Sequence, residues 1–265
     1  MLILGLGYTG TRLAAALREQ GWTVTGVKRA GDSESLSFDD EAAVRASIGR
    51  ASHILSSVPP DREGADPVLT RYGADIAASN ARWIGYLSSS GVYGDVGGAW
   101  VDESAPVGTG RRSARAEADL GWQALRSDMC IFRLPGIYGP GRSALDRVRE
   151  GKAHRIDLPG QIFSRIHVED IVSAILASFE GPTGVYNIAD DAPCSQNDVI
   201  DYTCRLLGLM PPPLLSLQEA NLSTQARAFY AENRRVANGK AKRLLDWRPL
   251  YRDYKEGLVT LLAET

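Results

Sequence analysis

Three glycines near the start of the chain have a spacing with chemical consequences. The apolar residues 2–4 run directly into Gly5-x-Gly7-x-x-Gly10, and an alanine- and leucine-rich helical pattern follows. Gly5 allows a tight turn, Gly7 lets the backbone approach a pyrophosphate, and Gly10 lets the helix pack close to the strand. The helix N-terminus, with Thr9 in its first turn, offers free N–H groups and a partial positive charge. The pattern predicts a dinucleotide site.

Two basic residues stand where a second strand ends. An NAD-binding site usually has an acidic residue near this point to accept hydrogen bonds from the adenine ribose. This chain has Lys28 and Arg29 instead, and two cations suit a 2′-phosphate. We therefore expect NADP(H), with NAD(H) as the alternative, although a solvated basic loop would look the same. Asp39 or Asp40 reaches the adenine in this interpretation, or caps the next helix.

Hydroxyl groups follow two further predicted strands. Ser57 lies at the end of an apolar strand over 53–58, where a small side chain lets a ribose or diphosphate pass close to the backbone. Residues 88–94 read Ser-Ser-Ser-Gly-Val-Tyr-Gly and follow the strand over 83–88. Parallel sheets bind ligands at the carboxyl edge that these residues occupy. The alternative is that the hydroxyls only cap the strand ends and turns.

Alternating strand and helix signals must position these residues. Strands are expected near 1–5, 23–28, 35–38, 53–58, 83–88, 129–134, 154–158 and 185–188, and helices near 9–20, 40–48, 66–79, 113–126, 144–150, 169–179, 195–207 and 238–244. This order predicts an α/β fold, a Rossmann-type doubly wound parallel sheet with a smaller C-terminal substrate lobe. We divide the chain into a dinucleotide-binding domain, 1–135, and a mainly substrate-binding lobe, 136–265, with some strands returning to the first sheet.

Composition limits the classes of partner. The chain has 265 residues, a net charge of −2 and 44% apolar residues, and no apolar stretch approaches the roughly 18 residues of a membrane span. We expect no nucleic-acid or membrane partner. The fold signal starts at residue 1, which predicts a cytoplasmic location. Cys130, Cys194 and Cys204 lack metal-ligand spacing and read as reduced thiols, so no metal is expected.

Five motifs in a fixed order carry a resemblance to a known family. They are Gly5-x-Gly7-x-x-Gly10, Ser88-Ser-Ser-Gly-Val-Tyr-Gly94, Arg133-Leu-Pro-Gly-Ile-Tyr-Gly-Pro-Gly141, Arg165-Ile-His-Val-Glu-Asp170 and Val185-Tyr-Asn-Ile-Ala189. The chain resembles the extended and atypical short-chain dehydrogenases/reductases of the NAD(P)-dependent epimerase/dehydratase type over nearly its whole length. The resemblance implies that Ser89 hydrogen-bonds the reacting oxygen and that Pro135 lies against the nicotinamide.

One departure from the family affects the chemistry. The family uses a Tyr-x-x-x-Lys pair, in which the tyrosine is the general acid/base and the lysine lowers its pKa. Here Arg111 occupies the tyrosine position and Arg115 the lysine position. Arg115 can still donate to a ribose, whereas a guanidinium does not deprotonate near neutral pH. Tyr93 and Tyr138 are the candidate replacement acids, or else both pack against their loops.

The resemblance implies two functions that the sequence leaves open. The first is an NADP(H)-dependent oxidoreductase or epimerase/dehydratase-like enzyme with Ser89, Tyr93 and Tyr138 as catalytic candidates. Its substrate would be a small polar or sugar-like molecule, which Arg142 would meet if it is anionic. The second is a non-catalytic NADP(H)-binding or sensor protein. A homodimer is the oligomer we consider.

Overall fold

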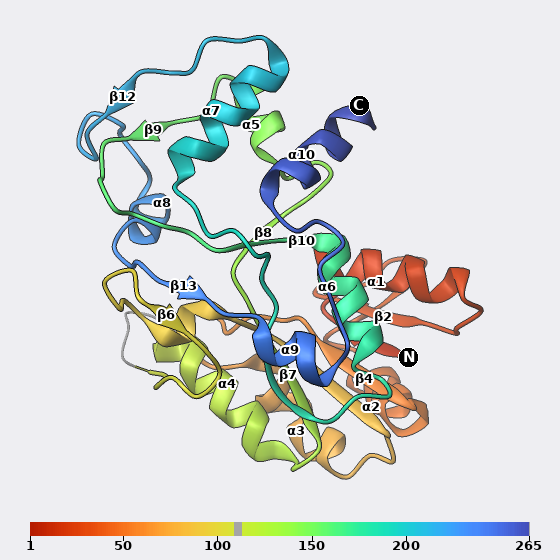
Figure 1. Ribbon diagram of the computed structural model, residues 1–265. Coiled ribbons are helices and arrows are strands. Elements are labelled where there is room, and N and C mark those ends of the chain that lie inside the picture. Colours follow the sequence, from red (N-terminus) through yellow and green to blue (C-terminus); the bar gives the residue numbers. More distant parts are fainter. Residues whose placement is uncertain (109–112, 265) are drawn as a thin grey trace.

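A seven-stranded parallel sheet forms the centre of the computed structural model, which describes residues 1–108 and 113–264 (Figure 1). The strand order is β11-β7-β5-β4-β1-β2-β3. Their bounds are β1 Leu2–Leu4, β2 Thr25–Lys28, β3 Ser35–Ser37, β4 His53–Ser56, β5 Trp83–Ser89, β7 Met129–Leu134 and β11 Gly184–Asn187. The chain direction across the sheet reverses between β1 and β4. This reversal creates the crevice in which open α/β sheets bind ligands.

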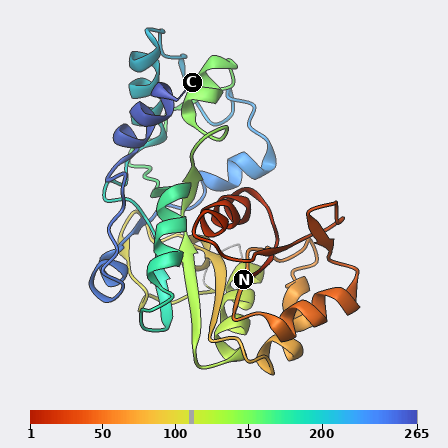
Figure 2. The same cartoon turned by 90° about the vertical axis from the view of Figure 1, so that its right-hand side faces the viewer.

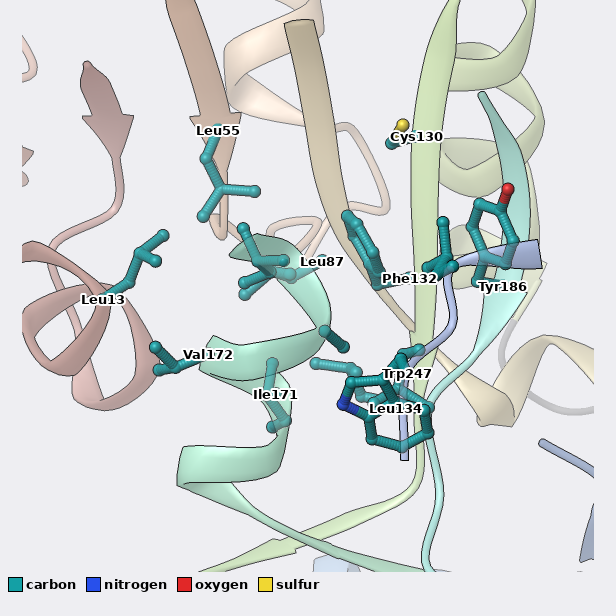
Figure 3. Close-up of a cluster of buried hydrophobic side chains, with 14 of the residues drawn as sticks. Leu13, Leu55, Leu87, Cys130, Phe132, Leu134, Ile171, Val172, Tyr186 and Trp247 are labelled. Atoms are coloured by element: carbon teal, nitrogen blue, oxygen red, sulfur yellow. The ribbon is translucent and has the colours of Figure 1, made fainter. Parts of the chain in front are cut away.

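Helices cover both faces of the sheet because its strands are apolar on both faces. In β1, Leu2 and Leu4 enter one core cluster and Ile3 enters the other. One face is covered by α2 (Glu41–Arg50), α3 (Pro67–Ala77) and α4 (Ser113–Leu125), and the other by α1 (Tyr8–Glu19), α6 (Val168–Ala177) and α9 (Gly239–Leu244). Figure 3 shows Leu13 of α1 and Val172 of α6 on this second face. Alternating side chains in a fully buried strand produce this double core.

The start of α3 follows the capping chemistry that the sequence predicts. Asp66 accepts hydrogen bonds from the backbone N–H groups of Val68 and Leu69, and Pro67 occupies the first helical turn. The same carboxylate accepts a hydrogen bond from Trp122 Nε1 of α4 at 2.8 Å. The cap therefore also fixes α3 against α4 beneath the sheet.

A second layer of helices stands over the carboxyl ends of the strands (Figures 1 and 2). It contains α5 (Ala144–Arg149), α7 (Gln196–Leu207), α8 (Thr224–Phe229) and α10 (Tyr254–Ala263). The short strands are β6 Trp100–Val101, β8 Gly136–Tyr138, β9 Arg155–Ile156, β10 Arg165–His167, β12 Leu214–Leu215 and β13 Arg235–Val236, and the 3-10 turn η1 spans Ser90–Tyr93. Leu145, Val199, Ile200, Tyr254 and Leu258 form this layer's own core.

The second half of the chain contributes to both layers. β11 pairs with β7 in parallel register, Tyr186 beside Phe132, so it extends the central sheet. α6 packs against α1 through the shared core. The division at residue 135 stays a prediction. Within the described ranges, no helix combines the length and the apolar content needed to cross a bilayer.

Candidate dinucleotide and substrate site

A cavity of about 850 Å³ opens at the carboxyl edge of the sheet, beneath the upper helical layer. It extends from the start of α1 at one end to α8 at the other, positions that Figure 1 shows on opposite sides of the molecule. Its lining includes seven of the residues that the sequence singled out: Gly7, Thr9, Ser57, Ser89, Arg115, Pro135 and Tyr138. The cavity therefore brings together residues that are far apart in the chain.

The glycine turn has the geometry that its sequence predicts. Gly5 has φ +92°, in the left-handed region that favours glycine. A Cβ on Gly10 would lie 2.7 Å from the carbonyl oxygen of Gly5 and 3.2 Å from Ile3, so α1 packs directly on β1. A Cβ on Gly7 would meet nothing within 4 Å, and Gly7 lines the cavity. The space above Gly7 is therefore open to a ligand.

Ser57 supports this turn from the neighbouring strand. Its hydroxyl donates a hydrogen bond to the carbonyl oxygen of Gly5, and a Cβ on Gly5 would lie 2.8 Å from Ser57 Oγ. Ser57 also lines the cavity. Its small side chain thus both closes the turn and leaves the cavity accessible.

Lys28, at the end of β2, has an acidic partner that its position in the sequence did not indicate. Lys28 forms an ion pair with Asp32 at 2.5 Å, and its hydrogen bond holds the pKa of Asp32 below the usual range. Arg29 is exposed on the loop beside them. Asp40 caps α2 by accepting from the Ala43 N–H, and Asp39 pairs with Arg71. Both aspartates thus have structural partners.

The hydroxyl turn at the end of β5 lines the cavity. Ser89 accepts a hydrogen bond from the Gly91 N–H at 3.1 Å and so caps η1, while its own O–H remains able to donate. Ser88 donates to Asp119 Oδ2 at 2.5 Å in the buried layer behind the turn. Ser89 is the half-buried hydroxyl of the turn, so it is the one best placed to meet a ligand.

A buried ion pair holds this turn from behind. Arg133 donates to both carboxylate oxygens of Asp119, at 3.0 and 2.7 Å, and the two side chains are 3% and 0% exposed. Gln123 donates to the same carboxylate at 2.6 Å. Sequence reasoning missed this pair. No local pattern could have found it, because Asp119 lies on α4 and Arg133 on β7, and only the packing of the helix on the sheet brings them together.

The structure places Tyr93 outside the cavity lining, which argues against the catalytic role that we considered for it. The side chain is 1% exposed and is absent from the cavity lining. Its hydroxyl donates to Asn187 Oδ1 at 2.7 Å and accepts from Arg133 at 3.1 Å. Burial raises the pKa of the phenol, so it is a structural member of the network around Arg133.

Tyr138 lines the cavity, but its hydroxyl contacts residues of the upper helical layer. The hydroxyl donates to the carbonyl oxygen of Asp253 at 3.5 Å. A Cβ on Gly257 would lie 2.3 Å from this hydroxyl, so it packs against α10. Burial raises the pKa of Tyr138. These contacts argue against the role of acid that we considered for it.

Arg115 and Tyr8 add polar side chains to the cavity lining. Arg115 lies in the first turn of α4, half-buried, and lines the cavity with Ser89. Arg111, at the family's tyrosine position, lies outside the described residues. Tyr8, within the glycine motif, donates to the Pro140 carbonyl at 3.1 Å, and the Arg142 guanidinium lies 5.6 Å from its ring. The 136–142 loop is thereby seated on the glycine turn.

Two motif residues of the second half have structural partners. Arg165 is 8% exposed and donates to the carbonyls of Phe163, Cys194 and Ser195. His167 is 2% exposed and caps α6 through Nδ1, and burial lowers its pKa to about 4. His167 is therefore neutral at physiological pH, as a structural histidine would be.

The chain is similar in sequence to proteins of other organisms. The Escherichia coli protein YeeZ is 30% identical over 79% of this chain and 84% of its own length. A Streptomyces protein named 3-diazoavenalumate denitrifying reductase is 26% identical over 95% of this chain and 96% of its own. No family model matches the chain.

Solved structures give the same placement. A functionally unknown protein from Silicibacter pomeroyi is 42% identical, with a TM-score of 0.88 over 100% of this chain and 98% of its own. The human epimerase family protein SDR39U1, solved with NADPH, is 17% identical, with a TM-score of 0.80 over the full length of both chains. At this lower identity the likeness concerns the fold.

Sheet order, glycine turn and cavity together define a protein with a Rossmann-type α/β fold, as the sequence predicts, and human SDR39U1 shares this fold. Within it, the chain belongs to the family that contains E. coli YeeZ and the S. pomeroyi protein.

Proposed function

We propose that this protein binds a nicotinamide dinucleotide across the carboxyl edge of the sheet and is an oxidoreductase or epimerase-like enzyme on a small-molecule substrate. The cavity that joins Gly7 to Ser89, Arg115 and Pro135 carries this proposal. The open space over Gly7 fits a diphosphate, and the N-terminus of α1 favours its charge. Structures of similar fold contain NADPH, or NAD with UDP-glucose, according to their descriptions.

Ser89 and Arg115 would carry the polar contacts at the reacting end. A nicotinamide supplies hydride transfer when bound. Ser89 would donate its O–H to the reacting oxygen, since its lone pair already accepts from Gly91. Arg115 would donate to the ribose. Neither group is a general acid near neutral pH, so the proton would come from water or from a group of the substrate.

NADP(H) is the form that we propose. Lys28 and Arg29 supply two positive charges after β2, although Asp32 offsets that of Lys28. Calorimetry should show tighter binding of NADPH than of NADH. The double variant Lys28→Ala, Arg29→Ala should abolish the difference while retaining NADH binding. Equal affinities in the unmodified protein would refute the preference, and binding of neither nucleotide would refute the whole proposal.

A non-catalytic NADP(H)-binding or sensor protein is the second candidate. It is favoured by the internal hydrogen bonds of Tyr93 and Tyr138, the two hydroxyls that could have replaced the family's acid. Turnover separates the candidates. The enzyme should oxidise NADPH with some member of a broad carbonyl panel, and Ser89→Ala should reduce this rate at least tenfold. NADPH binding without turnover of any panel member would favour the sensor.

A further inference from the structure

Apolar side chains wall the end of the cavity that is distant from the glycine turn. Leu222, Ala226, Phe229 and Tyr230 contribute from α8 and its flanks, and all are half-buried or exposed. Phe163 packs edge-to-face on Tyr230, with ring centroids 5.5 Å apart and an interplanar angle of 90°. Aromatic and apolar side chains that line a cavity favour a flat apolar ligand.

The guanidinium groups at this end already have partners within the protein. Arg165 donates to three backbone carbonyls and to Gln196 Oε1. Arg234 donates to the Gly94 carbonyl at 2.8 Å and to Glu232 Oε2 at 2.7 Å. These bonds take up part of the five N–H donors of each guanidinium, and Glu232 offsets the charge of Arg234, so this end offers a substrate diphosphate fewer free charged donors than two unpaired arginines would.

The remaining arginines of the lining do not replace them. Arg142 lies over the ring of Tyr8, at the glycine end. Arg147 of α5 lines the cavity near Tyr230, where its positive charge acts to lower the pKa of the phenol. Its Nη2 already donates to the Lys152 carbonyl at 3.0 Å. One such guanidinium matches a single carboxylate, and Glu232 adds a negative charge to the same lining.

The volume of the cavity points the same way. Pockets for a single small ligand measure roughly 300–1,000 Å³. The whole cavity is about 850 Å³ and, under the proposed function, must also hold the diphosphate and nicotinamide half of the cofactor. The space left at α8 suits a compound of one or two rings better than a second nucleotide.

We infer that the α8 end binds a carbonyl or hydroxyl compound with an aromatic or similarly flat apolar body, and not a nucleoside diphosphate sugar. This inference rests on the proposed function, because the carbonyl must face the nicotinamide near Ser89. It differs from the polar, sugar-like substrate that the family resemblance implies. The apolar body lies on Phe229 and Tyr230, and its oxygen points toward Ser89.

Ligand-observed NMR titration of the protein saturated with NADP⁺ tests the inference, with acetophenone and UDP-glucose as probes. Titration of NADP⁺ alone reports separately on the proposed function. Acetophenone should bind, Phe229→Ala should weaken it about tenfold, and Met210→Ala should have no effect. Met210 is a suitable control because it is apolar, 90% exposed and absent from the cavity lining.

Three results would overturn the inference while NADP⁺ binding stands. One is tighter binding of UDP-glucose than of acetophenone, weakened by Arg234→Gln. Another is acetophenone binding that Phe229→Ala leaves unchanged. The third is binding of neither probe. Circular dichroism of each variant checks the fold, and Phe229, at 48% exposure, can be truncated without opening the core.

Discussion

Gly7 and Gly10, in the turn after β1, have different surroundings. We expect Gly7 to matter for ligand binding and Gly10 for folding. A Cβ on Gly7 would enter open space in the cavity, whereas one on Gly10 would meet the Gly5 carbonyl at 2.7 Å. The sequence motif predicted both roles because strand, turn and helix are local. It could not predict the burial of Tyr93, since the direction of that side chain depends on η1 and on Arg133 of a distant strand.

A pair of variants tests this division of roles. Gly7→Val should lose NADPH binding by at least tenfold while the free energy of unfolding changes by less than about 1 kcal/mol, because its side chain projects into the ligand space. Gly10→Val should instead destabilise the protein by about 2 kcal/mol or more, because the helix must move off the strand. Calorimetry and urea unfolding measure the two effects. Normal NADPH binding by Gly7→Val would show that the phosphates bind elsewhere.

The Asp119–Arg133 pair should dominate the stability of the hydroxyl turn. Asp119→Ala leaves the Arg133 guanidinium buried without its carboxylate, which costs about 3–5 kcal/mol. Ser88→Ala removes one hydrogen bond to the same carboxylate and should cost about 1 kcal/mol. Urea unfolding compares the two variants. Equal costs would mean that the ion pair is not the main support of the turn.

At the scale of elements, the central sheet and the helices that cover it were predictable, whereas several short elements of the second half of the chain were not. The central strands are short runs of apolar residues and helices carry caps such as Asp66, so local patterns located them within a few residues. The sequence analysis missed α8 and α10, and it missed the short strands β8 and β10. The pairing of β8 with β10 joins residues 136–138 to 165–167, and no local pattern specifies that partner.

Asp190, just after β11, should make stability depend on pH. It is 3% exposed, Oδ1 accepts from the Ala192 N–H, and Oδ2 has no hydrogen-bond partner among the described residues. Burial raises the pKa of Asp190 to about 7. The positive charge of Arg165 acts to lower this pKa, and the negative charge of Asp253 acts to raise it. The folded state therefore binds more protons than the unfolded state between about pH 4 and 7. In this window the contribution of Asp190 to the free energy of unfolding falls as pH rises.

Asp190→Asn isolates this effect. The amide keeps the Oδ1 acceptor and cannot ionise, so the variant should be more stable than the unmodified protein at pH 8 by about 1 kcal/mol or more. The difference should shrink toward pH 4. Denaturant unfolding at several pH values measures it. A stability difference that does not change with pH would contradict the raised pKa.

At the scale of the whole molecule, the cavity exists because the upper layer stands over the carboxyl edge of the sheet. Gly7, Ser89 and Pro135 lie at the carboxyl ends of three different strands, and Tyr138 and Arg142 come from the segment that connects β7 to α5 of the upper layer. Parallel topology predicts that the strand ends meet. The position of α8, and with it the apolar character of the substrate end, depends on tertiary packing that the sequence pattern does not specify.

The crystal structure of the protein soaked with NADP⁺ tests the central claim most directly. The diphosphate should lie at the backbone N–H groups that begin α1, over Gly7, and the nicotinamide C4 should face Ser89 between Arg115 and Pro135. A nucleotide bound outside this cavity, or one whose nicotinamide is remote from Ser89, would contradict the claim.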